Sequence, residues 1–148
     1  MKLLFLDIDG VLNSEATFKR EHRLAFEGLF TMDARMVNRL KRIISETEAK
    51  IVLSSTWRRN ILWPMALYGN GIDLNSVIGT TPITREGEIR GDKVNAFIKQ
   101  TEDVITVEKY AILDDDLDFH SEQPLFKTSW KEGLTDEIAD QVIAYLNE

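Results

Sequence analysis

The chain contains no cysteine among its 148 residues. This absence excludes disulfide bonds, thiolate-bound zinc and a cysteine nucleophile, and it favours the cytoplasm as the location. Long apolar runs are also lacking, since none approaches the roughly 20 residues that a helix needs to span a bilayer. The apolar N-terminal run ends at Asp7, before the core of a signal peptide is complete. We therefore expect a cytoplasmic protein without a membrane partner.

Basic residues are outnumbered by acidic ones. Lys and Arg total 18 and Asp and Glu total 25, which gives a formal net charge of -7. Such a chain lacks the basic footprint of a nucleic-acid coat or of a membrane-surface protein. Two short basic stretches, 19–23 and 57–59, are candidates for a local patch, although runs of charge are usually solvated surface.

Proline and glycine are too few and too scattered to form a linker, with 3 prolines and 8 glycines in the chain. The sequence also has no internal repeat and no low-complexity segment. Its length is that of one ordinary domain. We expect a single domain over residues 1–148.

Short apolar runs alternate with helical patterns along the chain. The apolar runs have the length and continuity of strands buried on both faces, and the helical patterns follow Thr31, Gly91 and Thr135. Continuous apolar strands separated by helices indicate an α/β fold, with a parallel sheet covered by helices on both faces. The expected strands are 3–6, 51–53, 76–78, 110–113 and 125–128, and the helical patterns are 36–44, 94–98 and 138–146.

Polar and charged side chains stand at the carboxyl ends of the expected strands, where ligands bind in such sheets. Asp7 and Asp9 follow the first strand in FLDIDGVL. The second apolar run ends in IVLSSTWRR, and the fourth ends in YAILDDDLD. Between these two runs, RGDK places a basic residue at the start of a helix. Each feature alone is ordinary loop chemistry, but together they indicate a functional site.

These four motifs resemble, in order and over nearly the whole chain, those of the haloacid dehalogenase-like (HAD) phosphohydrolases. DIDGVLN, LSSTWR, DDDLD and GLT are also similar to the small HAD domains of RNA-repair proteins. The resemblance implies a three-layer, Rossmann-like fold. It also implies that Asp7 is the nucleophile that forms an aspartyl-phosphate and that Asp9 is the general acid and base. Ser54 and Lys93 would hold the phosphoryl oxygens, with Arg90 as the alternative to Lys93.

The converging carboxylates predict a metal site. Oxygen ligands without His or Cys favour Mg2+ over zinc, and the cation would remove the repulsion between neighbouring acids. The expected ligands are Asp7, Asp9 through its backbone carbonyl, and Asp114, which follows the fourth apolar run directly. Asp115 is the second choice, as a ligand through water or as a group that orients the basic residue.

Residues beside the motifs are candidates for contact with the substrate, namely Ser55, Trp57, Arg58 and Arg90. The aromatic ring and the guanidinium group suit contact with a phosphate or stacking on a base. For Trp57, packing against the core is the alternative. The additional segment 57–89 would shape one rim of the site.

The expected site is open, because residues 14–50 leave no room for more than a minimal cap. An open site favours large substrates, whose own bulk can enclose the reacting phosphate. The sequence thus predicts a Mg2+-dependent phosphomonoesterase that acts on a nucleotide or a nucleic-acid terminal phosphate, with a phosphoprotein as the less favoured substrate. A phosphotransferase is one alternative, and a non-catalytic phosphate-binding or interaction module of HAD fold is the other. The sequence decides neither the oligomeric state nor whether a kinase or ligase works beside the chain.

Overall fold

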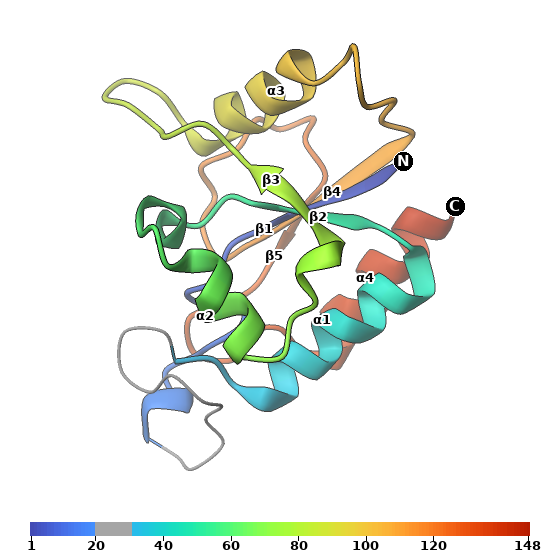
Figure 1. Cartoon of the computed structure of the whole chain (residues 1–148). Helices are drawn as coiled ribbons and strands as arrows, with labels where there is room; N and C mark the ends of the chain where they lie inside the picture. The colour runs from blue at the N-terminus through green and yellow to red at the C-terminus, as the bar shows by residue number, and fades with distance from the viewer. Residues whose placement is uncertain (20–30) are drawn as a thin grey trace.

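A computed structural model describes residues 1–19 and 31–148. Within these residues, five strands form one parallel sheet in the order β3-β2-β1-β4-β5 (Figure 1). The strands are β1 (Lys2–Leu6), β2 (Lys50–Leu53), β3 (Val77–Thr80), β4 (Lys109–Asp114) and β5 (Leu125–Lys127). The α-helices are α1 (Ala34–Thr47), α2 (Trp63–Gly69), α3 (Arg90–Gln100) and α4 (Asp136–Asn147).

The two faces of the sheet are covered by different helices. Successive side chains of a strand point to opposite faces, and β1 shows this alternation clearly. Leu4 and Leu6 belong to the core shared with α1 and α4, whereas Leu3 and Phe5 pack with Phe97 of α3. Figure 1 shows α1 and α4 together on one side of the sheet and α3 on the other. These three layers confirm the predicted α/β fold.

The carboxyl ends of the three central strands are level. In the sheet, Leu6 of β1 pairs with Leu53 of β2 and with Leu113 of β4. The ladder continues for one residue, because the N–H of Asp7 donates to the carbonyl of Leu113 (3.0 Å) and the N–H of Ser54 donates to the carbonyl of Leu6 (2.9 Å). The residues that follow these strand ends therefore meet at one edge.

The cap residues of two helices test the predicted helix starts. Thr135 caps α4 as predicted, since its hydroxyl accepts the N–H of Ile138 at 3.3 Å. The cap predicted at Thr31 is wrong: Asp33 caps α1 and accepts the N–H of Arg35 at 2.9 Å. A carboxylate directly before the first helical residue satisfies a free N–H and also suits the positive end of the helix dipole.

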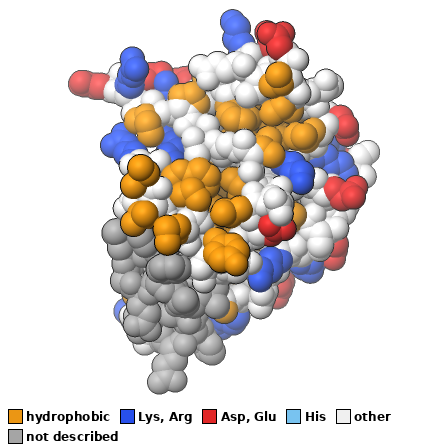
Figure 2. Space-filling view, viewed as in Figure 1, with side chains coloured by type: hydrophobic (Ala, Val, Ile, Leu, Met, Phe, Trp, Pro, Cys, Tyr) orange, Lys and Arg blue, Asp and Glu red, His pale blue; other side chains and the backbone are white. Residues whose placement is uncertain are grey.

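Most of the basic stretch 19–23 falls in residues 20–30, which lie outside the described residues; the 3-10 helix η1 (Thr17–Lys19) precedes them. The segment after β2 holds the 3-10 helix η2 (Thr56–Arg59) and α2, and exposes Ile61, Met65 and Tyr68. Hydrophobic side chains gather on this face of the molecule (Figure 2). No helix within the described ranges is long and apolar enough to cross a membrane.

Candidate active site

Three carboxylates converge at the carboxyl edge, from β4 and from the loops after β1 and β4. Oxygen atoms of Asp7, Asp114 and Asp115 all lie within 4.8 Å of one another. Asp7 is 3% exposed and Asp114 is 0% exposed, whereas Asp115 is partly exposed. This all-oxygen set fits a hard divalent cation such as Mg2+. Among the described acids, the carboxylate of Asp9 stands outside this cluster.

Gly10 allows the loop after β1 to approach Asp115. Its φ of 80° lies in the left-handed region, which glycine adopts without strain. A Cβ atom at this position would also clash with the carboxylate of Asp115. Glycine is therefore required here by backbone conformation and by the closeness of the acid.

The buried carboxylates have raised pKa values. Burial, and then the charge of Asp114, raises the pKa of Asp7 to about 8, against a smaller opposing effect of Arg90. Burial likewise raises the pKa of Asp114, and Arg90 again opposes the rise. A bound cation would favour the ionised forms of both groups in the same way as Arg90, but more strongly, because it carries two charges.

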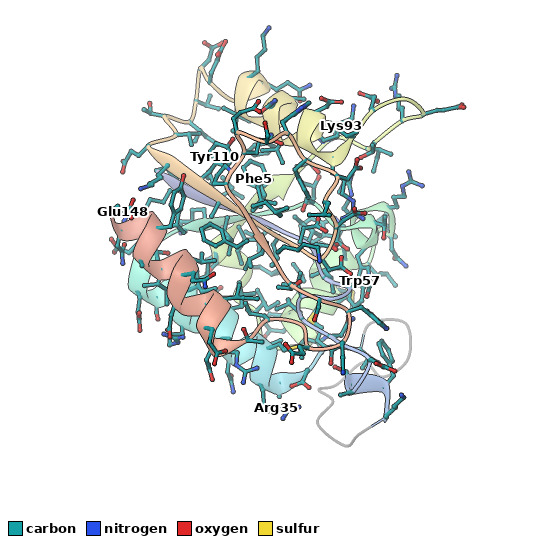
Figure 3. All side chains as sticks on the ribbon, turned by 180° about the vertical axis from the view of Figure 1, so that it is seen from behind. Phe5, Arg35, Trp57, Lys93, Tyr110 and Glu148 are labelled. Carbon is teal, nitrogen blue, oxygen red and sulfur yellow. The ribbon has the colours of Figure 1, made fainter. Side chains whose placement is uncertain are left out.

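Arg90 and Lys93, the two candidates for the basic residue, have different partners. Arg90 Nη1 lies 2.7 Å from Asp114 Oδ2 and 3.4 Å from Asp7 Oδ2. Lys93 is buried at the start of α3 (labelled in Figure 3), and its Nζ pairs with the carboxylate of Glu88. The structure thus brings the guanidinium group, and not the lysine amine, to the acid cluster.

The loop after β4 holds the start of α3 against the acids. Asp118 Oδ2 accepts the N–H of Arg90 at 3.2 Å, and the Asp118 carbonyl accepts the N–H of Gly91 at 3.0 Å. His120 Nε2 lies 2.7 Å from Asp92 Oδ1, which adds a second contact between the loop and the helix. These contacts fix the backbone that carries Arg90.

Ser54 and Ser55, at the end of β2, differ in what their hydroxyl groups do. Ser54 is 5% exposed, and its Oγ has no hydrogen-bond partner among the described residues. A buried hydroxyl without a partner is unusual and marks a place where a ligand oxygen can bind. Ser55 Oγ instead accepts the N–H of Trp57 at 3.2 Å and caps η2. The predicted substrate contact by Ser55 stays a prediction.

Arg58 is occupied by backbone carbonyls. Its Nε donates to Thr81 (3.0 Å), its Nη1 to Ser54 and Ser55 (2.7 Å each) and its Nη2 to Pro82 (3.0 Å). A guanidinium group has five N–H donors, so these four bonds leave one for any other partner. The arrangement ties the carboxyl end of β2 to that of β3, and the predicted substrate contact by Arg58 stays untested.

Asp9 is held by two side chains. Trp57 Nε1 donates to its Oδ2 at 3.0 Å, and Asn13 Nδ2 donates to its Oδ1 at 2.9 Å. Trp57, labelled in Figure 3, also packs partly buried against the larger core, as the packing alternative expects. Sequence reasoning missed Asn13, and its place at the end of DIDGVLN, close after two acids, is the signal that could have found it.

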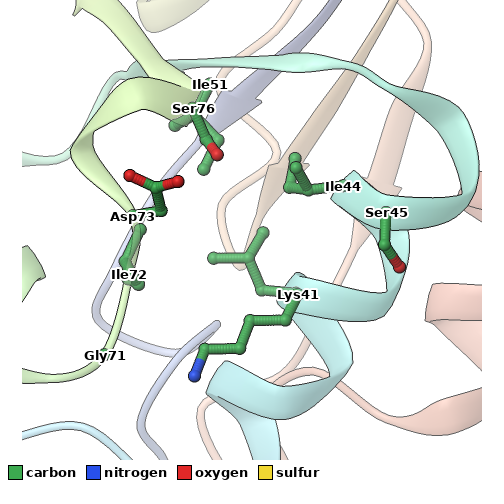
Figure 4. A pocket seen from close by; sticks show the side chains of 9 residues that line it. Lys41, Ile44, Ser45, Ile51, Gly71, Ile72, Asp73 and Ser76 are labelled. Atoms are coloured by element: carbon green, nitrogen blue, oxygen red, sulfur yellow. The ribbon is translucent and has the colours of Figure 1, made fainter.

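Hollows in the surface differ in chemistry. One of about 220 Å³ lies between α1 and the segment before β3, and its lining includes Leu40, Ile44 and Ile72 but none of the clustered acids (Figure 4). Most of its exposed lining is apolar, although Lys41, Ser45, Asp73 and Ser76 also line it. Another, of about 260 Å³, borders the acid cluster and is lined by Asp115, Asp116, Leu117 and Lys127. A hollow with charged side chains in its lining therefore adjoins the acids.

The parallel sheet, with acids, a buried hydroxyl and a guanidinium group at its level edge, agrees with the fold and site expected of the HAD class. The chain belongs to the family described as the HAD domain in Swiss Army Knife RNA repair proteins, whose profile matches residues 3–139. Neither the curated proteins nor the solved structures gave a significant match. Membership confirms the resemblance seen in the motifs and supports a phosphatase-like role. HAD proteins generally use Mg2+, in agreement with the acid cluster.

Proposed function

We propose that this chain is a Mg2+-dependent phosphomonoesterase that works through an aspartyl-phosphate on Asp7. The observation that supports this most is the level edge of β1, β2 and β4. It brings the carboxylates of Asp7 and Asp114 together with the unpartnered hydroxyl of Ser54. Phosphoryl transfer needs little beyond a nucleophile, charge compensation and hydrogen-bond donors in fixed positions.

Asp7, Asp114 and Asp115 would hold the cation, and the resemblance adds the backbone carbonyl of Asp9. When bound, Mg2+ offsets the negative charge that the acids and the phosphate bring together. Arg90 takes the role of the basic residue in this proposal, since its guanidinium group lies 2.7 Å from Asp114. Such a fixed charge keeps the acids and the phosphoryl oxygens in one arrangement during transfer.

The proposed reaction has two steps. First, a carboxylate oxygen of Asp7 attacks phosphorus, the bond from phosphorus to the leaving oxygen breaks, and Asp9 donates its proton to that oxygen. Second, Asp9 takes a proton from a water molecule whose oxygen attacks phosphorus, and the bond from phosphorus to Asp7 breaks. Phosphate leaves, and both aspartates return to their starting states. The hydroxyl of Ser54 donates to a phosphoryl oxygen in both steps.

The proposed substrate is a nucleotide or a nucleic-acid terminal phosphate, with a phosphoprotein as the second choice. The family is described as a domain of RNA repair proteins, which supports a nucleic-acid end. The hollow beside Asp115 and Lys127 offers room for a leaving group larger than a small alcohol. The net charge of -7 counts against tight binding that is independent of sequence.

The test is phosphate release with Mg2+ from an aryl phosphate, mononucleotides, a phosphopeptide and oligonucleotides phosphorylated at the 3' or 5' end. Release that needs Mg2+ and is lost in both Asp7→Asn and Asp9→Asn supports the proposal, and the best substrate defines the class. Transfer to an added alcohol or nucleoside would identify a phosphotransferase. A folded chain that binds Mg2+ but releases no phosphate from any substrate would favour the non-catalytic binding module.

A further inference from the structure

We propose that Trp57 and Asn13 are positioning residues for Asp9, which hold its carboxyl group where it can pass a proton to the leaving oxygen. The inference rests on the proposed function and adds two residues to it. Asp9 Oδ2 accepts a hydrogen bond from Trp57 Nε1 (3.0 Å), and Asp9 Oδ1 accepts one from Asn13 Nδ2 (2.9 Å). Because each oxygen has its own donor, rotation of the carboxyl group would break both bonds.

Asn13 is itself fixed within the loop after β1. It is 0% exposed, and its Oδ1 accepts the N–H of Gly10 at 2.9 Å. Its Nδ2 also donates to the carbonyl of Thr31 at 3.1 Å. Both hydrogens of the amide and its oxygen are thus engaged, so the side chain cannot turn without breaking buried hydrogen bonds. Asn13 therefore ties Asp9 to the same turn that places Gly10 against the acid cluster.

Trp57 holds Asp9 from η2, the short helix that follows the neighbouring strand β2. Its backbone N–H donates to Ser55 Oγ at 3.2 Å, at the start of η2. Its ring packs against the core that β1 shares with α1 and α4. The indole is thus anchored at the backbone and at the ring, and its N–H reaches an acid that is 48 residues away in the sequence.

The chemistry of the two donors suits a group that must give up and regain a proton. An indole N–H and an amide N–H only donate, so neither can take the proton that Asp9 carries. An ionised carboxylate has about four lone-pair sites, and the two hydrogen bonds occupy two of them. The remaining sites can carry the proton and meet the leaving oxygen. Among the described residues no ion pair involves Asp9, in contrast to Asp7 and Asp114.

The kinetic test compares Trp57→Phe with the matched control Trp63→Phe, which makes the same change at a tryptophan packed on the same core. General acid catalysis matters most for a poor leaving group, so kcat/KM is measured for 4-nitrophenyl phosphate and for an alkyl phosphate such as glycerol 2-phosphate. We expect Trp57→Phe to lower kcat/KM about tenfold for the alkyl phosphate and less than about threefold for the aryl phosphate. Trp63→Phe should leave the ratio of the two values unchanged.

Two kinetic outcomes would overturn the inference. Equal losses on both substrates would show that Trp57 acts through packing alone. A higher kcat/KM of Trp57→Phe for the alkyl phosphate would show that the hydrogen bond holds Asp9 in a resting position away from the leaving group. Asp9→Asn gives the upper limit of the effect, because it removes the proton donor itself.

A measurement without turnover separates this inference from the proposed function. In NMR spectra, the indole N–H resonance of Trp57 is assigned by its loss in Trp57→Phe. The same resonance is then followed in Asp9→Ala. We expect this signal to shift and to exchange faster with solvent, while that of Trp63 stays. An unmoved signal would disprove the contact even in an active enzyme. A shifted signal in a chain that cleaves no phosphoester would remove the proposed function, and the catalytic role of the contact with it.

Discussion

Burial and the neighbouring carboxylate of Asp114 both oppose the ionisation of Asp7 in the folded chain. Its pKa rises from 3.8 to about 8. A carboxyl group whose pKa is raised by folding contributes stability in its protonated form. That contribution is fully present below about pH 4 and is lost as the pH rises through about 8. Without a metal ion, this group therefore destabilises the fold increasingly from mildly acidic to mildly basic pH.

The first prediction concerns Asp7→Asn in the presence of a chelator. The amide cannot ionise, so between pH 5 and pH 8 we expect the native chain to lose about 3–4 kcal/mol in free energy of unfolding that the variant keeps. Urea unfolding at the two pH values measures the difference. A difference that does not grow with pH would mean that Asp7 is not held in a charged and buried cluster.

The second prediction separates Arg90 from Lys93 by making the same change at each. We expect Arg90→Met to lower kcat by about a hundredfold, because it removes the charge that contacts Asp114 and Asp7. Lys93→Met should lower it by less than about threefold, since that amine is paired with Glu88. The reverse order of effects would assign the role to Lys93.

The ambiguity between these two residues has a physical cause. Arg90 and Lys93 are three positions apart on a helix, so they lie on the same face and either can point to the same site. What separates them is Glu88, which takes up the lysine amine, and Asp118, which fixes the backbone of Arg90. Both are contacts that a pattern of residue types along the chain does not specify. The clustered acids themselves were predictable, because each stands at the end of a buried strand or directly after it.

At the scale of elements, Arg58 links the carboxyl ends of β2 and β3. The third prediction is that Arg58→Lys lowers the free energy of unfolding by about 1–2 kcal/mol, because an ammonium group cannot reproduce the planar fork of donors. The exposed neighbour Arg59 provides the control, and Arg59→Lys should change stability by less than about 0.5 kcal/mol. Urea unfolding measures both, and KM should stay unchanged. A raised KM with unchanged stability would instead support the substrate contact predicted from the sequence.

The elements themselves were largely predictable, because buried strands are marked by continuous apolar runs and helices by their period. The residue at which α1 begins was not predictable, since Thr31 and Asp33 are both good cap residues and their spacing favours neither. In the fold, the carbonyl of Thr31 accepts a hydrogen bond from Asn13, whereas Asp33 directly precedes the helix. The hydrogen bond from Trp57 to Asp9 joins two loops, and only the assembled sheet brings these loops together.

At the scale of the whole molecule, Mg2+ should stabilise a chain of net charge -7 through one local site. The fourth prediction is that Mg2+ at a hundred times its Kd raises the free energy of unfolding by about 2.7 kcal/mol. Asp114→Asn should lose most of this gain, because it removes a buried ligand. The control Asp116→Asn, at an exposed acid two residues away, should keep it. Equal gains in both variants would mean that Mg2+ binds elsewhere or only screens charge.

The most direct test of the central claim is to find the phosphoryl group on Asp7 itself. The chain is mixed with Mg2+ and its best substrate, quenched in acid during turnover and treated with borohydride, which converts a phosphorylated aspartate to homoserine. Mass spectrometry of the N-terminal peptide then identifies the position. We expect homoserine at residue 7, dependent on both substrate and Mg2+. Homoserine at residue 9, or none during active turnover, would contradict it.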